Sequence, residues 1–248
     1  MDFSGISRDS LIGRVLRTPL RLVPASAVLP ILQGPLRGHR WIVGAGTHGC
    51  WLGSYEYSKQ RLFAAAAKPG AVVYDVGANV GFYSLLAARR AGPAGTVVAF
   101  EPLLRNLLFL RRHLELNRVA NVDVVEAAVS ESTGLQSFST EHHASMGRLA
   151  TDGALQVRTV SLDDVVFKDG RPRPHLIKMD IEGGEAAALR GGRRVLEECR
   201  PTLFLATHGW EQHQACCELL RQLAYELAAI DGRPLDESDE IMARPRGR

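Results

Sequence analysis

The fold of this chain is decided by one stretch, Val72-Val73-Tyr74-Asp75-Val76-Gly77-Ala78-Asn79-Val80-Gly81-Phe82-Tyr83-Ser84. A short run rich in β-branched residues ends at Asp75, a glycine-containing turn follows, and a helical pattern begins near Phe82. A strand, a tight loop and a helix N-terminus in this order are the geometry with which α/β proteins hold a nucleotide-like ligand. The stretch therefore predicts the first strand of such a sheet, followed directly by a ligand loop.

The glycines of this loop separate the possible ligands. In the dinucleotide pattern G-x-G-x-x-G the middle glycine lets the backbone approach a pyrophosphate. Counted from Gly77, the middle position is Asn79 and the third is Phe82, so two of the three glycines are missing. The Gly-Lys-Ser/Thr of a phosphate-binding loop does not follow the turn either. The remaining pattern, Asp-x-Gly-x-x-x-Gly, suits a ligand with an amino acid moiety and no phosphate.

A second strand, Thr96–Phe100, ends in Glu101. An acid at the tip of strand two is placed to accept hydrogen bonds from both hydroxyls of a ribose. The alternative is an incidental acid in a doubly wound fold. Together with the first loop, the pattern resembles the nucleoside and methionine site of class I methyltransferases.

Composition limits the class of protein. The chain has 248 residues, 46% of them hydrophobic, enough for one large domain or two small ones. No apolar run reaches the roughly 18 residues that cross a bilayer, and the N-terminus lacks the features of a signal peptide, so we expect a cytoplasmic protein. The cysteines Cys50, Cys199 and Cys216-Cys217 form no metal or redox spacing and are expected to be buried or half-buried.

Charge is unevenly distributed along the chain. Residues 1–70 carry nine Lys/Arg against three Asp/Glu, and residues 71–248 carry 21 against 24. The basic N-terminal segment could contact a membrane surface, nucleic acid or an acidic substrate, or could simply be a solvated helix face.

The order of elements predicts an α/β fold with a mostly parallel sheet and helices on both faces, because strands and helices alternate from residue 71 onward. Residues 1–49 are expected to form an N-terminal cap over the ligand pocket, with helices near 9–16 and 25–32 and a strand at 41–43. Residues 50–248 are expected to form the main domain. Its later elements are strands at 122–126, 136–139, 155–160, 176–180, 202–207, 225–230 and 240–243, and helices at 82–91, 103–116, 185–198 and 211–222.

Four motifs in order give a more specific resemblance. They are residues 75–84, Phe100-Glu101-Pro102, Ser161-Leu162-Asp163-Asp164, and residues 177–185, Ile-Lys-Met-Asp-Ile-Glu-Gly-Gly-Glu. Together they resemble the FkbM family of S-adenosylmethionine-dependent methyltransferases over roughly residues 50–245. The resemblance implies a doubly wound, Rossmann-like class I domain with a seven-stranded sheet, S-adenosylmethionine as donor, and methylation mainly of hydroxyl oxygens on sugars and secondary metabolites.

The donor site follows from this resemblance and from the carboxyl ends of the strands, where open sheets bind ligands. Asp75 should favour the ammonium and sulfonium groups, Glu101 should hold the ribose, and residues 126–129 should lie along the adenine. The expected donor-site residues are Tyr55, Glu56, Asp75, Gly77, Ala78, Asn79, Gly81, Glu101, Asn106, Glu126, Ala127, Ala128, Val129 and Asp180.

The expected catalytic residues are Lys178, Asp180, Glu182 and His208. Residues 178–185 hold four charged groups at the tip of a buried strand. Burying such groups costs free energy unless they form ion pairs or belong to a functional site. An ion pair of Lys178 with a carboxylate explains part of them, and Asp180 and Glu182 should face the donor or the acceptor. The family often has a glutamate shortly before this histidine, but here Ala206 and Thr207 precede it. His208 is therefore the candidate general base, and an unperturbed histidine has a pKa near 6.5.

Asp180, Glu182 and His208 could also supply oxygen and nitrogen ligands to a divalent metal. The sequence defines no such geometry, so a metal is left open and no ligand is assigned.

The acceptor is expected to be a small molecule or a glycan. N-methylation, peptide methylation and donor binding without turnover are the alternatives. Nucleic acid is not expected as a partner, because no Asn-Pro-Pro-Tyr-like or Pro-Cys element follows strand four. The oligomeric state is not predicted.

Overall fold

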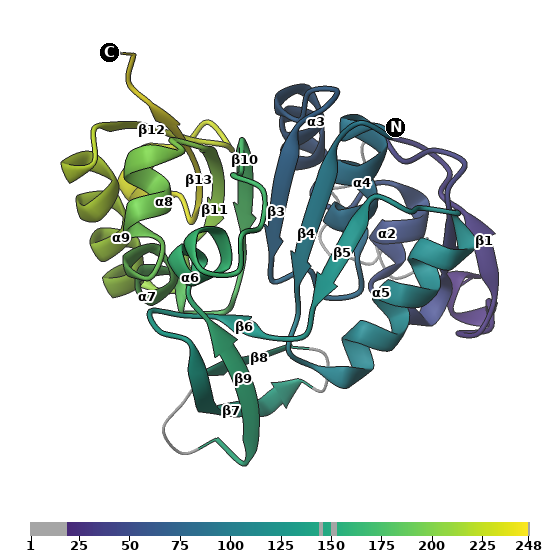
Figure 1. Cartoon of the computed structure of the whole chain (residues 1–248). Helices are drawn as coiled ribbons and strands as arrows, with labels where there is room; N and C mark the ends of the chain where they lie inside the picture. Colours follow the sequence, from purple (N-terminus) through teal and green to yellow (C-terminus); the bar gives the residue numbers. More distant parts are fainter. Residues whose placement is uncertain (1–18, 144–145, 150–152, 248) are drawn as a thin grey trace.

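A computed structural model describes residues 19–143, 146–149 and 153–247. Its centre is a seven-stranded sheet in the order β12-β13-β11-β10-β3-β4-β5 (Figure 1). The neighbours from β11 to β5 pair in parallel, and β13 is antiparallel to both β11 and β12. The predicted α/β fold with a mostly parallel seven-stranded sheet is confirmed. The strands are β3 (Val72–Val76), β4 (Thr96–Phe100), β5 (Val122–Val125), β10 (Leu176–Met179), β11 (Thr202–Ala206), β12 (Tyr225–Ala229) and β13 (Glu240–Pro245).

Helices cover both faces of this sheet, which is why its central strands are apolar along nearly their whole length. Alternate residues of β3 enter different cores: Val73 packs with α4 and α5, while Tyr74 and Val76 pack with the helices of the other face. The first face carries α3 (Tyr57–Ala66), α4 (Phe82–Ala91) and α5 (Leu104–Leu116), and the second carries α6 (Leu162–Phe167), α7 (Glu185–Arg190), α8 (Arg193–Glu198) and α9 (Trp210–Gln222).

Most predicted elements agree with the structure to within a few residues. The predicted helix 185–198 is instead two short helices, α7 and α8, separated at Gly191-Gly192, where helix propensity is lowest. The four cysteines are free thiols, three of them buried and Cys199 half-buried, as predicted.

A second, smaller sheet lies below the main one in Figure 1. Its order is β6-β9-β7-β8, with β6 (Ala128–Val129), β7 (Gly134–His143), β8 (Met146–Leu149) and β9 (Leu155–Val160). The sequence predicted strands within β7 and β9 but not their assembly into a separate sheet, because cross-strand pairing is a tertiary property. This sheet places Phe138 and Leu149 beside the main cavity described below.

The described part of the N-terminal segment is a hairpin and a short helix. β1 (Val28–Pro30) pairs antiparallel with β2 (Arg40–Ile42), and α2 (His48–Leu52) follows. The helix predicted at 25–32 is wrong: pairing of β1 with β2 prevails there, and Pro30 lacks the N–H that a helix interior needs. The helix predicted near 9–16 lies outside the described residues, and the boundary at residue 50 stays a prediction.

His113 of α5 attaches this hairpin to the main domain. Its Nε2 accepts a hydrogen bond from the Ile42 N–H at 3.1 Å, and its Nδ1 donates to the Val80 carbonyl at 2.7 Å. The ring stacks on Trp41 with centroids 3.9 Å apart. Burial lowers the pKa of His113 to about 4, so the ring is neutral at physiological pH. Within the described residues, no helix combines the length and the apolar character needed to cross a membrane.

Candidate functional site

A cavity of about 600 Å³ opens at the carboxyl ends of β3, β4 and β10. β3 is the middle one of the five parallel strands, and the chain winds from it in both directions; open α/β sheets bind ligands at such a place. The predicted residues in its wall are Tyr55, Gly77, Ala78, Asn79, Glu101, Asn106, Ala127, Ala128, Val129, Lys178, Asp180 and Glu182.

The loop after β3 forms one wall of the cavity. Gly77 has φ +77°, and a Cβ on it would lie 2.0 Å from the carbonyl oxygen of Asp180, so only glycine fits between the two strand ends. The N–H groups of Gly77 and Ala78 donate to the Phe100 carbonyl at 3.1 and 2.9 Å. These contacts hold the loop against the end of β4.

Glu101 lies at the tip of β4 and is 4% exposed. Its carboxylate accepts hydrogen bonds from the N–H groups of Asn79 and Leu103, both at 2.9 Å, and from Asn106 Nδ2 at 3.2 Å. Burial raises the pKa of Glu101, and these three donors oppose the shift. The carboxylate is therefore both part of the cavity wall and the link between the loops that follow β3 and β4.

Asp75 lies outside the cavity wall, and its predicted effect on the ammonium and sulfonium groups of the donor stays a prediction. Its side chain is fully buried, accepts a hydrogen bond from Ser84 Oγ at 2.6 Å and pairs with Lys178 Nζ at 3.6 Å. Burial raises the pKa of Asp75, and the charge of Lys178 opposes this. Lys178 does line the cavity and donates to the Gly77 carbonyl at 2.9 Å. Asp75 thus acts on the cavity by positioning Lys178.

Three other predicted donor-site residues also lie outside the wall. Glu126 points to the surface, where it pairs with Arg111. Gly81 packs against Leu110 at the start of α4. Glu56 accepts a hydrogen bond from the Tyr83 hydroxyl at 2.8 Å.

Glu56 belongs to a charged network beside the cavity. Lys59, which is 4% exposed, pairs with Glu56 at 3.3 Å and with Glu240 of β13 at 2.7 Å. Through Lys59, the network connects α3 to β13 of the main sheet.

Sequence reasoning missed several wall residues. They are Gly44, Ala45, Gly46, Thr47 and Cys50 from the N-terminal segment, Leu103 and Arg105 from the start of α5, and Phe138, Gly147 and Leu149 from the small sheet. The glycine-rich run at 44–49 was a visible signal, but it predicted only a turn.

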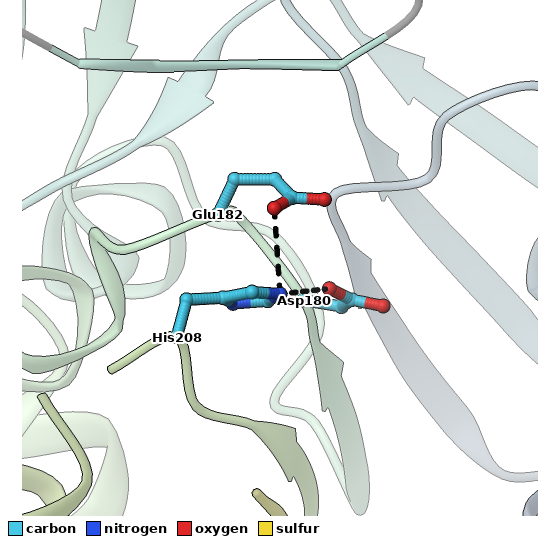
Figure 2. Close-up of side chains that lie close together, drawn as sticks. All are labelled: Asp180, Glu182 and His208. Carbon is cyan, nitrogen blue, oxygen red and sulfur yellow. Dashed lines mark ion pairs between the residues drawn. The ribbon is translucent and has the colours of Figure 1, made fainter. Parts of the chain in front are cut away.

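A charged cluster occupies the ends of β10 and β11. Nε2 of His208 lies 3.6 Å from Asp180 Oδ1 and 3.4 Å from Glu182 Oε2, as Figure 2 shows. The three groups can bring one ligand atom each within 4.8 Å of one another. On the other side of the ring, Nδ1 of His208 makes a 2.8 Å hydrogen bond with the fully buried Glu185. The structure thus brings Asp180, Glu182 and His208 together, and Lys178, the fourth predicted catalytic residue, pairs with Asp180 at 3.9 Å.

The cluster changes the acidity of its members. The hydrogen bond to Glu185 and the charges of Glu185, Asp180 and Glu182 outweigh burial and raise the pKa of His208 to about 9. The prediction of a pKa near 6.5 is wrong for this arrangement, because it took no account of Glu185. Burial opposes the ionisation of Asp180, yet the charges of Lys178, Lys59 and His208 prevail and lower the pKa of Asp180.

A second, more open cavity of about 770 Å³ lies beside this cluster. Glu182 lines both cavities, and His208 and Trp210 line the second, where Trp210 is 56% exposed. The charged cluster therefore stands at the junction of the two cavities, of which the first is the more enclosed and the second the more open.

The family described as Methyltransferase FkbM domain matches residues 75–227. The hexuronic acid methyltransferase AglP of Haloferax volcanii is 29% identical over 139 residues, which cover 55% of this chain and 56% of that protein. The 31-O-demethyl-FK506 methyltransferase FkbM of Streptomyces tacrolimicus is 29% identical over 158 residues, covering 50% of this chain and 60% of that protein. The chain thus spans little more than half the length of these two relatives.

One solved structure gives the fold. The crystal structure of the methyltransferase FkbM from Methylobacillus flagellatus matches with a TM-score of 0.50 at 20% identity, over 80% of this chain and 55% of that one. The seven-stranded sheet and its helices therefore form the class I methyltransferase fold.

Proposed function

Because this chain belongs to the family of FkbM methyltransferase domains, we propose that it transfers the methyl group of S-adenosylmethionine to a hydroxyl oxygen of a sugar or a secondary metabolite. The observation that carries the proposal is the cavity at the ends of β3, β4 and β10, with the Glu101 carboxylate in its wall and a charged cluster at its mouth.

The residues of the enclosed cavity fit each part of the donor. Glu101 and Asn106 offer polar groups to the ribose hydroxyls, and Ala127 to Val129 offer an apolar edge to the adenine. The loop at Gly77 has no phosphate-binding pattern and comes next to Lys178 and Asp180, which suit the carboxylate and ammonium of a methionine moiety. When bound, the donor supplies a methyl group activated by a positively charged sulfur.

The residues at the junction fit the acceptor. An acceptor in the open cavity would meet the exposed Trp210, whose ring offers an apolar face to a sugar. Its reacting hydroxyl would lie at Asp180, Glu182 and His208, between the acceptor and the donor. The protein then has mainly to align the hydroxyl with the methyl group and to exclude water.

The two relatives support the acceptor class. One is described as acting on a hexuronic acid and the other on 31-O-demethyl-FK506, a sugar acid and an oxygen position of a secondary metabolite. Methylation of nitrogen or of a peptide, and donor binding without turnover, become outcomes of the test.

The test measures donor binding first and transfer second. Calorimetry should show S-adenosylmethionine binding in the micromolar range, about −8 kcal/mol, with NAD bound far more weakly. The chain is then incubated with donor and matched acceptors that differ only in a free or a blocked hydroxyl, and S-adenosylhomocysteine is quantified. Turnover that requires the free hydroxyl supports the proposal. Tight NAD binding without donor binding, or turnover only with amines or peptides, contradicts it.

A further inference from the structure

Nε2 of His208 lies between two carboxylates at ion-pair distances. The distances of 3.6 Å to Asp180 and 3.4 Å to Glu182 both exceed an ordinary N–H···O hydrogen bond of about 2.7–3.2 Å. Ligand atoms bound to one divalent ion at about 2.1 Å lie roughly 3.0 Å apart at an octahedral angle and roughly 3.4 Å apart at a tetrahedral one. The two observed separations are close to the larger value. These two separations therefore suit ligands of a common centre, and the ligand atoms of the three groups all lie within 4.8 Å of one another.

Glu185 holds the imidazole in the orientation that such a centre needs. Its carboxylate is fully buried, accepts the Gly183 N–H at 3.0 Å and contacts Nδ1 of His208 at 2.8 Å. With Nδ1 engaged, Nε2 is directed at the two other carboxylates (Figure 2). A carboxylate behind a histidine is the usual outer partner of a metal-binding imidazole, because it sets the tautomer and the ring orientation.

The backbone conformation of Glu182 and the charges of the cluster also favour a ligand site. Glu182 has φ +58°, a left-handed conformation that is strained for a residue with a long side chain. A strained backbone conformation persists only where the surrounding structure imposes it, and such conformations are frequent at ligand-binding sites. The cluster also places three carboxylates, Asp180, Glu182 and Glu185, around one imidazole. Lys178, 3.9 Å from Asp180, offsets part of this negative charge, and a divalent cation at this position would balance the rest.

We propose that Asp180, Glu182 and His208 bind a divalent cation, which holds the methyl acceptor by its hydroxyl oxygens. Two carboxylate oxygens and one imidazole nitrogen suit Mn²⁺, Fe²⁺ or Zn²⁺ better than an ion that prefers only oxygen ligands. Asp180 lines the enclosed cavity, His208 the open one and Glu182 both, so the remaining coordination positions face the place where donor and acceptor meet. The role of the cation rests on the proposed function.

The site also narrows the acceptor class. A five- or six-coordinate Mn²⁺ or Fe²⁺ with three protein ligands keeps neighbouring positions for two acceptor oxygens, so a vicinal diol or a 2-hydroxy acid fits better than an isolated hydroxyl. The hydroxyl oxygen bonds to the methyl carbon, the C–S bond of the donor breaks with its electron pair kept by sulfur, and the hydroxyl proton passes to water in the open cavity. Positive charge beside the hydroxyl makes this proton easier to lose.

The test is a titration of the whole chain with Mn²⁺, after chelator treatment and dialysis, without donor or acceptor. Calorimetry and the electron spin resonance signal of free Mn²⁺ should show one ion per chain. Glu182→Gln should weaken binding by about 10-fold or more, and Glu185→Gln by about 10- to 100-fold. Glu211→Gln is the matched control, because its carboxylate lines the same open cavity outside the cluster, and it should bind Mn²⁺ like the wild type.

Binding of S-adenosylhomocysteine by each variant shows that it is folded. Absence of Mn²⁺ and Zn²⁺ binding to the wild type overturns the cation site, as does equal affinity of the wild type and a folded Glu182→Gln. The two proposals fail separately. A chain that methylates hydroxyls equally well in excess chelator refutes the cation alone, and a chain that binds Mn²⁺ but methylates no hydroxyl refutes the proposed function.

Discussion

Replacing Glu101 by glutamine should weaken donor binding while leaving the chain folded. The side chain keeps its shape, and its remaining carbonyl oxygen can still accept from the Leu103 N–H and from Asn106. The new amide NH₂ would then face the N–H of Asn79, which now donates to the carboxylate at 2.9 Å. The substitution therefore removes the charge and places an amide NH₂ against the half-buried N–H of Asn79.

The magnitudes follow from these contacts. A hydrogen bond to a charged group stabilises by about 1.5–3 kcal/mol and a neutral one by about 0.5–1.5 kcal/mol. With two ribose hydroxyls bound, the loss in donor binding should be roughly 2–3 kcal/mol, a 30- to 150-fold rise in Kd. Loss of the hydrogen bond from the Asn79 N–H to the carboxylate should lower the free energy of unfolding by about 1–3 kcal/mol. Burial disfavours the charged form of Glu101 and raises its pKa. A neutral glutamine avoids this cost, which reduces the loss of stability.

Calorimetry with S-adenosylhomocysteine and urea unfolding measure the two effects on one sample. Glu126→Gln is the matched control: the sequence placed Glu126 in the donor site, but the structure pairs it with Arg111 at the surface, so donor affinity should stay within about twofold. If Glu101→Gln binds the donor like the wild type, or if Glu126→Gln is the variant that loses affinity, the assignment of the ribose to Glu101 is wrong.

Three further predictions concern stability and donor binding. Since the pKa of His113 is about 4 in the folded chain against 6.5 unfolded, the unfolded state binds the extra proton between these values, and the free energy of unfolding should fall by about 3 kcal/mol as the pH drops from 6.5 to 4. Urea unfolding at several pH values in this range should show that the free energy of unfolding changes less with pH in His113→Leu than in the wild type. An equal pH dependence of the two proteins would contradict the assignment. Lys59→Met should cost about 2–4 kcal/mol in urea unfolding, because the Glu240 carboxylate loses its partner at 2.7 Å, and adding Glu240→Leu should recover much of it; no recovery would argue against the pair. Gly77→Ala should abolish donor binding in calorimetry, whereas Gly70→Ala, with φ +76° but nothing within 4 Å of the added carbon, should cost only about 1–2 kcal/mol of stability. Equal effects of the two alanines would show that the close approach is unimportant.

Local sequence was sufficient for the framework of the site. The strand that ends at Asp75, the loop at Gly77 and the acid at the tip of β4 could be predicted because strand periodicity, glycine positions and strand ends are properties of short segments. The same reasoning failed at residues 25–32, where the pairing of β1 with β2 overrides any helical tendency.

Which way the side chains point was decided only by the tertiary structure. Asp75 was predicted to favour the charged groups of the donor, and the approach of Lys178 from β10 makes it a buried support. The acidity of His208 depends on Glu185, 23 residues earlier in the chain, and Glu56 reaches Glu240 through Lys59. The sequence alone determined the sheet, the ligand loop and the kinds of charged group at its edge, since these follow from local pattern. The contacts that set each group's pKa, and the spacing of Asp180, Glu182 and His208, required the folded chain, because they are made between strands that only packing brings together.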